Sequence, residues 1–175
     1  MAYSYSNIYK LPTTALRFFT VYGPWGRPDM ALFKFTKGIL SNKKIDIYNN
    51  GKMYRDFTYI DDVVDAVIKC AFKVATPNIP KRDELENPSH SYSQHRIFNI
   101  GNNKPTELEY FISLIEKNLN KKAIKNYLDM QPGDVESTFA NTKDLQDWIN
   151  FKPSTSIDIG IKNFIGWYLS YYKNS

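Results

Sequence analysis

Leu16-Arg17-Phe18-Phe19-Thr20-Val21-Tyr22-Gly23-Pro24-Trp25-Gly26-Arg27-Pro28 is the stretch that best indicates the fold. A β-rich run stops at a turn that carries Gly23, Pro24 and Gly26, and Arg27 follows at the far edge of that turn. Ligands of open α/β sheets bind just beyond the carboxyl ends of the strands. The stretch therefore predicts a site for an anionic small molecule, with an ordinary strand and turn as the alternative.

Extended and helical patterns alternate along the rest of the chain. Strands are predicted at Thr13–Phe19, Ile45–Tyr48, Met53–Phe57 and Arg96–Ile100. Helices are predicted to span Met30–Leu40, to start near Asp61, and to span Thr106–Leu119, Thr142–Ile149 and Ser156–Tyr171. This alternation is typical of an α/β protein.

Local signals refine these elements. Thr58 is expected to begin a helix in a capping box, and its apolar face is expected to comprise Val63, Val64, Val67, Ile68 and Ala71. Thr106 is expected to cap the helix that follows it. The stretch Thr76–His95 has no periodicity, so we predict a long loop in which His90 and His95 are exposed.

Composition and charge bound the class of protein. With 175 residues, 42% of them hydrophobic, the chain can bury one substantial core. It has no apolar run of the roughly 18 residues that a membrane span needs. Cys70, the one cysteine, lies in an apolar helical pattern, where we expect a small core residue of a cytoplasmic protein. We therefore expect no membrane partner.

The net charge of +5 raises nucleic acid as a partner. The basic residues are scattered in short pairs such as Lys43-Lys44 and Lys121-Lys122, without a long basic tract. A solvated lysine-rich surface explains them better, so no nucleic acid is expected. The two histidines lack cysteine support for a zinc site, and no metal is predicted.

Four ordered blocks resemble one enzyme family. They are Leu16–Pro28, Gly51–Val64, Phe98–Asn102 and Gln131–Val135. Together they are similar to the NAD-dependent nucleotide-sugar epimerases and dehydratases of the extended short-chain dehydrogenase/reductase family. Thr20, followed by Trp25 and Arg27, most resembles UDP-glucuronate 4-epimerases within that family.

The resemblance implies an interleaved pair of domains. Residues 1–23 and 56–102 would be the remaining strands and helices of an NAD(P)-binding Rossmann fold, and residues 24–55 and 103–175 a small α/β domain that binds the UDP-sugar. The sequence has no glycine-rich dinucleotide turn and no Tyr-x-x-x-Lys pair in a matching context. It is therefore expected to be the C-terminal half of an epimerase without the N-terminal Rossmann half, and such a half sheet should expose apolar surface.

The resemblance also assigns candidate substrate-binding residues. Thr20 and Arg27 are expected to hold the glucuronate carboxylate, since a guanidinium forms a bidentate fork with a carboxylate. Arg55 is expected to clamp the UDP diphosphate, with a structural arginine–carboxylate pair as the alternative. Gln131 and Asp134 are expected to contact the uridine ribose and base, although Gln131 replaces the arginine of related hexose epimerases.

The resemblance assigns four further residues, two of them to the UDP-sugar and two to NAD. Tyr48 and Asn49 are expected to flank the same UDP-sugar, and Phe18 and Val21 to lie beside the nicotinamide of NAD. No residue of the chain is assigned as the catalytic base. Partners implied by the family are a UDP-sugar, a separately encoded N-terminal half, and, in full-length relatives, a second copy of the chain.

Three functions remain open from sequence. The first is an incomplete UDP-glucuronate 4-epimerase of polysaccharide biosynthesis, which converts UDP-glucuronate to UDP-galacturonate when complete and is inactive alone. The second is a non-catalytic UDP-sugar-binding or subunit-interaction module. The third is a basic nucleic-acid-binding protein, which the scattered charges disfavour.

Overall fold

The computed structural model describes residues 1–79 and 90–173. Its helices are α1 (Ala2–Tyr9), α2 (Ala31–Leu40), the 3₁₀ turn η1 (Tyr48–Gly51), α3 (Ile60–Phe72), α4 (Leu108–Leu119), α5 (Lys143–Ile149) and α6 (Ile157–Lys173). Its strands are β1 (Thr13–Phe18), β2 (Thr20–Tyr22), β3 (Lys44–Ile47), β4 (Tyr54–Tyr59), β5 (His95–Ile100), β6 (Pro105–Glu107) and β7 (Ile124–Tyr127). The α/β class predicted from the sequence is confirmed.

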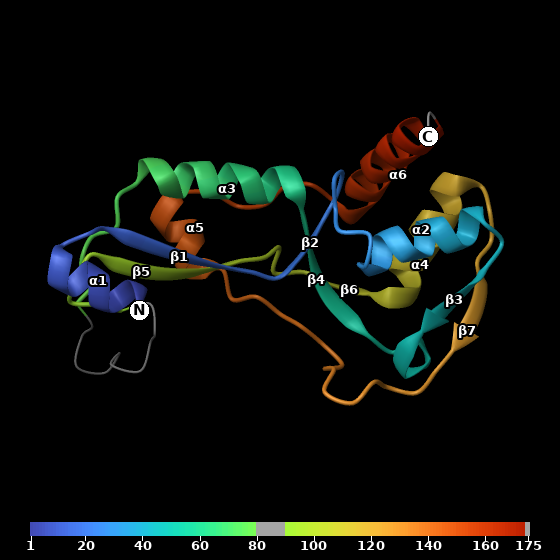
Figure 1. Cartoon of the computed structure of the whole chain (residues 1–175), viewed down its shortest axis with the longest axis horizontal. Helices are drawn as coiled ribbons and strands as arrows, with labels where there is room; N and C mark the ends of the chain where they lie inside the picture. Colours follow the sequence, from blue (N-terminus) through green and yellow to red (C-terminus); the bar gives the residue numbers. More distant parts are fainter. Residues whose placement is uncertain (80–89, 174–175) are drawn as a thin grey trace.

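The strands form three small sheets. β1 pairs in parallel with β5, β3 pairs in parallel with β7, and β4 lies between parallel β2 and antiparallel β6. Figure 1 shows β1 and β5 between α1, α3 and α5 at one end of the molecule, α2, α4, α6, β3 and β7 at the other, and β2, β4 and β6 between the two.

The strand predicted at Thr13–Phe19 ends one residue early and changes sheet. β1 stops at Phe18, and Phe19 donates its backbone N–H to the carbonyl of Ile100 at 3.0 Å. The chain then resumes at Thr20 as β2, which pairs with β4 in the neighbouring sheet. The sequence did not indicate this switch, because residues 13–22 contain no glycine or proline to mark a break between the strands.

The larger core lies under α2, α4 and α6. Each of these helices buries an apolar stripe of the predicted spacing, for example Leu32, Phe33 and Ile39 from α2. Phe57 of β4 stacks on Phe111 of α4, with ring centroids 4.3 Å apart. Seventeen buried side chains form this cluster, so it is the larger hydrophobic core of the described structure.

The smaller core lies between α3, α5 and the β1–β5 sheet. It holds six buried side chains, namely Val63, Ala66, Cys70, Phe98, Ile100 and Leu145. Cys70 is buried as a core residue, and burial raises the pKa of its thiol. The predicted face of α3 is apolar but mostly uncovered, because Val64, Val67 and Ile68 are exposed and only Val63 of that set is buried.

Other local predictions also need correction. The N-caps of α3 and α4 are Tyr59 and Glu107, without side-chain capping bonds, so Thr58 and Thr106 do not cap them. Thr58 is buried in β4, and Thr106 lies in β6.

The loop prediction for Thr76–His95 is wrong at its end. His95 opens β5 and is buried, and its Nδ1 lies 2.6 Å from the Thr13 hydroxyl. Residues 80–89 of that stretch lie outside the described residues. In the parts of the chain that are described, no helix has both the length and the apolar character for a membrane crossing.

Candidate functional site

The junction of β1 and β2 places the first group of predicted residues. Phe18, at the carboxyl end of β1, is about half exposed, and Val21 packs against the smaller core. Thr20 starts β2 and lies opposite Phe57 of β4 in the parallel register. These three residues therefore line the carboxyl end of one sheet and the neighbouring start of another, where ligands of α/β proteins bind.

The turn after β2 carries Arg27. Gly23 adopts φ +142°, and a Cβ there would lie 2.5 Å from Ile60 Cγ2, so only glycine lets the turn close over α3. Arg27 is exposed in the turn, where its Nε donates to Asp29 Oδ1 at 3.0 Å. This hydrogen bond raises the pKa of Arg27 and lowers the pKa of Asp29. An anion bound by Arg27 must therefore compete with Asp29.

Arg55 and Asp134, 79 residues apart in sequence, form an ion pair. Arg55 Nη2 lies 2.8 Å from Asp134 Oδ1, and the arginine side chain is only 17% exposed. Arg55 Nη1 also donates to the carbonyls of Tyr54 at 3.0 Å and Glu136 at 3.2 Å. These bonds fix the guanidinium and leave some of its N–H donors for a ligand.

Gln131 belongs to the same cluster through its turn. The Asp134 N–H donates to the Gln131 carbonyl at 3.2 Å, and Gly133 adopts φ +83°, which glycine permits without strain. Both Gln131 and Asp134 are exposed. The predicted trio of Arg55, Gln131 and Asp134 is thus brought together by the fold, and Arg55 engages the carboxylate that the alternative interpretation required.

Tyr48 and Asn49 lie in the turn between β3 and β4. Asn49 and Asn50 both adopt φ near +49°, a conformation that asparagine tolerates better than most residues. The Asn50 N–H donates to the Leu128 carbonyl at 3.0 Å, which fixes this turn beside the chain that leads to Gln131. Asn49 Nδ2 donates a hydrogen bond to the Lys52 carbonyl at 2.8 Å.

Tyr48 also lines a pocket between α2 and β3. Its volume is about 310 Å³, and its walls are Asp29, Ala31, Lys34, Phe35, Lys44, Ile45, Asp46 and Tyr48. Its two lysines are matched by two aspartates, so the lining presents both signs of charge beside apolar and aromatic surface. Because Asp29 is also the partner of Arg27, the pocket joins Arg27 to Tyr48.

The sequence did not reveal Asp29, Lys34 or Asp46 as neighbours of the site. Asp29 stands two residues from Arg27, so the Arg-Pro-Asp spacing was a usable signal for that pair. Lys34 and Asp46 meet only through the packing of α2 on β3, for which the sequence gives no local signal.

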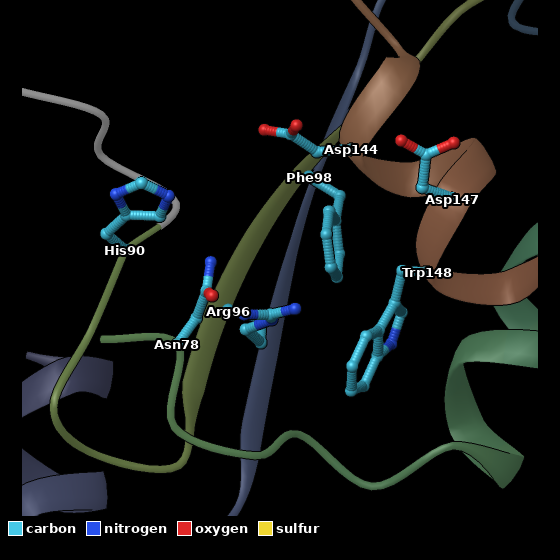
Figure 2. Close-up of a pocket in the computed structure, with 7 residues that line it drawn as sticks. All are labelled: Asn78, His90, Arg96, Phe98, Asp144, Asp147 and Trp148. Carbon is cyan, nitrogen blue, oxygen red and sulfur yellow. The ribbon is translucent and has the colours of Figure 1, made fainter. Parts of the chain in front are cut away.

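A second hollow lies at the opposite end of the β1–β5 sheet (Figure 2). Its volume is about 260 Å³, and it is lined by Asn78, His90, Arg96, Phe98, Asp144, Asp147 and Trp148. Arg96 pairs with Thr14 at the amino ends of the parallel strands. The Arg96 guanidinium carbon lies 4.4 Å from the centroid of the Trp148 ring. None of the predicted site residues lines this hollow.

A protein-family model matches more than half of the chain. The model is that of the NAD dependent epimerase/dehydratase family, and it matches residues 1–101. The chain belongs to this family. NAD is therefore the cofactor of the family, as the sequence predicted, and the Rossmann-type fold class is confirmed.

Individual relatives match nearly the whole chain. Protein CapI of Staphylococcus aureus is 55% identical over 173 residues, which are 99% of this chain and 52% of that protein. A probable UDP-glucuronate 4-epimerase of Rhizobium meliloti is 46% identical over 178 residues, 100% of this chain and 52% of the relative. The chain thus spans about half the length of the curated relatives it matches.

A solved epimerase has the same arrangement. The crystal structure of UDP-glucuronic acid 4-epimerase from Bacillus cereus, in complex with UDP-glucuronic acid and NAD, superposes with a TM-score of 0.78 at 30% identity. The match covers 97% of this chain and 49% of that one. That solved enzyme holds a nucleotide sugar together with NAD.

The residues of this chain fit one part of NAD. An exposed aromatic ring at the carboxyl end of β1, as Phe18 provides, suits contact with a flat nicotinamide. A pyrophosphate needs a glycine-rich turn ahead of a helix, and this sequence contains none. Within this chain only the nicotinamide side of the cofactor has candidate residues.

Proposed function

We propose that the chain is the substrate-binding half of a UDP-glucuronate 4-epimerase. The observation that carries the proposal is the cluster of Arg55, Gln131 and Asp134, assembled from two distant parts of the chain at the positions where the family resemblance assigns UDP contacts. The identity with a probable UDP-glucuronate 4-epimerase and the fold of a solved one support it.

The two cationic groups have separate roles in this proposal. Arg55, mostly buried and fixed by three bonds, meets the diphosphate, which every UDP-sugar shares. Arg27, on the exposed turn that follows β2, meets the carboxylate that distinguishes glucuronate from glucose. Tyr48 and Asn49 flank the nucleotide, with the pocket between α2 and β3 beside them.

Catalysis needs groups that this sequence does not carry. NAD, when bound, takes up and returns hydride at the sugar carbon. Phe18 and Val21 orient the nicotinamide, and the residues above hold the sugar. The general base and the pyrophosphate turn must come from additional polypeptide, in the same molecule or in a separately encoded half. The exposed apolar face of α3, with Val64, Val67, Ile68 and Phe72, is where we place that polypeptide.

The carboxylate assignment is tested with Arg27→Leu. Calorimetric titration of the chain with UDP-glucuronate and UDP-glucose should show a loss of about tenfold or more for UDP-glucuronate, since a charge-assisted bond is removed, and little change for UDP-glucose. Arg17→Leu, an exposed arginine of β1, is the matched control. Equal weakening of both ligands would contradict the assignment.

Arg55→Ala tests the diphosphate assignment against the structural alternative. Loss of this guanidinium should weaken UDP and both UDP-sugars alike, by about tenfold to a hundredfold. If Arg55 only pairs with Asp134, the variant will unfold at lower denaturant concentration while its folded fraction binds UDP with unchanged affinity.

A non-catalytic UDP-sugar-binding module is the second candidate. The sequence has no glycine-rich dinucleotide turn, and its Tyr-x-x-x-Lys spacing, Tyr48 to Lys52, lies at the turn η1 rather than on a helix, which favours this candidate. Mixing the chain with the N-terminal half of a homologous epimerase separates the two candidates. Restored conversion of UDP-glucuronate supports the epimerase, whereas UDP binding without any restored conversion supports the module.

A further inference from the structure

Asp56 is a buried carboxylate beside Arg55 that the proposed function does not use. It has no exposed surface. Its Oδ1 accepts the Asn102 N–H at 3.0 Å, and its Oδ2 accepts the N–H groups of Asn103 at 3.0 Å and Ala140 at 3.1 Å. Burying an ionised carboxylate is costly unless such bonds compensate it. We therefore expect this arrangement of three N–H groups around Asp56 to have a specific role.

The bonds of Asp56 join three segments that are far apart in sequence. The carboxylate comes from β4, two acceptor bonds reach the loop after β5, and the third reaches the segment that follows Asp134. A Cβ on Gly101 would lie 2.3 Å from Ala140 Cβ and 2.9 Å from Asp56 Oδ2. Only glycine at 101 lets the three segments approach this closely.

The segment after Asp134 has little else to hold it. Residues 131–137 are exposed, and they lie outside the helices and longer strands of the described chain. Besides the bonds of Arg55 to Asp134 and to the Glu136 carbonyl, residues 134–138 contact β4 through the Tyr54 N–H to the Glu136 carbonyl at 2.9 Å, the Thr138 N–H to the Tyr54 carbonyl at 3.2 Å, and the Asp56 N–H to Thr138 Oγ1 at 3.2 Å. Asp56 closes this run of bonds at its buried end, and Arg55 with Asp134 closes it at its exposed end.

We propose that Asp56 is a positioning residue that fastens residues 134–140 along β4 and so sets Asp134 and Gln131 against Arg55. That the positioned residues bind UDP rests on the proposed function. The fastening itself rests on the hydrogen bonds alone. The geometry of the nucleotide site then depends on Asp56, a side chain that touches no ligand.

Asp56→Asn is the direct test, because it keeps the size of the side chain. Whichever way the amide is oriented, its NH₂ group faces at least one of the three backbone N–H groups, and that bond is lost. We expect hydrogen exchange at Asn102, Asn103 or Ala140 to accelerate by about tenfold or more, and UDP affinity to fall by about tenfold. Asp65→Asn, an exposed aspartate of α3, is the matched control.

A double-mutant cycle separates positioning from general stability. In an Asp134→Asn background the UDP contact that Asp56 is proposed to align is already weakened, so Asp56→Asn should then cost less than about threefold. Equal losses of affinity in both backgrounds would overturn the proposal. So would unchanged exchange at the three amides in Asp56→Asn.

Gly101→Ala provides a second variant that leaves every charge in place. Its added methyl group pushes on Ala140 and Asp56 and should reproduce the faster exchange and the weaker UDP binding. Gly166→Ala, where a Cβ meets nothing within 4 Å, is its control. If neither Asp56→Asn nor Gly101→Ala folds, Asp56 serves the fold rather than the site, and the proposal is overturned.

Failure of the proposed function has a different signature. If the unmodified chain does not bind UDP, the UDP-binding role falls with the proposed function. The exchange rates of Asn102, Asn103 and Ala140 then decide by themselves whether Asp56 fastens the segment.

Discussion

The part of the molecule built on α2, α4 and α6 covers its apolar side chains, whereas the part built on β1, β5 and α3 does not. The first buries seventeen side chains in one cluster, and the second buries six. On α3 alone, Phe72 is 87% exposed, and Val64, Val67 and Ile68 are also exposed. A two-stranded parallel sheet with one bare apolar helix is half of a layered structure.

The contrast separates the residues proposed to bind the UDP-sugar from those proposed to contact NAD. The residues proposed to grip the nucleotide, such as Arg55 and Tyr48, stand on the well-covered part. Phe18 and Val21, proposed to meet the nicotinamide, stand on or beside the sparsely covered part. We expect the first part to be stable and ligand-competent by itself, and the second to depend on further polypeptide.

The largest test of this contrast compares two buried phenylalanines. Phe111→Ala opens a cavity in the larger core and should lower the free energy of unfolding by about 3–5 kcal/mol. Phe98→Ala, in the smaller core, should cost about 2 kcal/mol, because loosely covered surroundings collapse more easily into the space. Urea unfolding of both variants measures the two values. Equal costs would contradict the view that the smaller core is loosely covered.

Glu116 gives an intermediate test within the larger core. Burial of this carboxyl opposes ionisation, but the Ala123 N–H and the Lys122 ammonium, each 2.9 Å away, outweigh it, and the pKa of Glu116 is lowered. A lowered pKa adds stability that is complete above the ordinary glutamate value of about 4.3 and is lost as pH falls through the folded-state value.

Glu116→Gln should therefore cost about 1 kcal/mol near pH 7 and almost nothing in strong acid. Thermal unfolding of both proteins across this pH range gives the difference. A gap between the two proteins that stayed constant down to strong acid would show that ionised Glu116 does not contribute.

The smallest expected effect is on the exposed face of α3. Phe72→Ser should change the free energy of unfolding by less than about 0.5 kcal/mol, because the ring already lies in solvent. It should at the same time reduce self-association of the chain, which light scattering measures. A marked loss of stability would mean that Phe72 is packed in solution, and the contrast between the two parts would fail.

The sequence predicted the elements that bury a clean apolar stripe. The helices α2, α4 and α6 follow the 3.6-residue period, and their burial agrees with it. Helix α3 has the same period, but it is apolar on two sides. Only one of these sides is covered by other described residues. Periodicity reports that a face is apolar, but it does not report which neighbour covers that face.

The site was predictable as residues but not as an arrangement. Arg55, Gln131 and Asp134 were found by resemblance, whereas their contact depends on the path of residues 134–140 along β4. The short strands β6 and β7 were not predicted, because β6 begins with a proline and has no apolar side chain other than that proline, and β7 has two polar residues between Ile124 and Tyr127. Asp56 was seen only as a neighbour of Arg55, and its three acceptor bonds are non-local.

Strand β1 has a consequence for the behaviour of the protein in solution. Within the described structure it pairs with β5 alone, so its other edge offers backbone N–H and C=O groups to any strand that approaches. Pro12 just before the strand and exposed Arg17 within it are residue types that discourage such contacts. These residues oppose edge-to-edge pairing without covering the edge. We therefore expect the chain to stay monomeric in dilute solution and to form intermolecular sheets at high protein concentration.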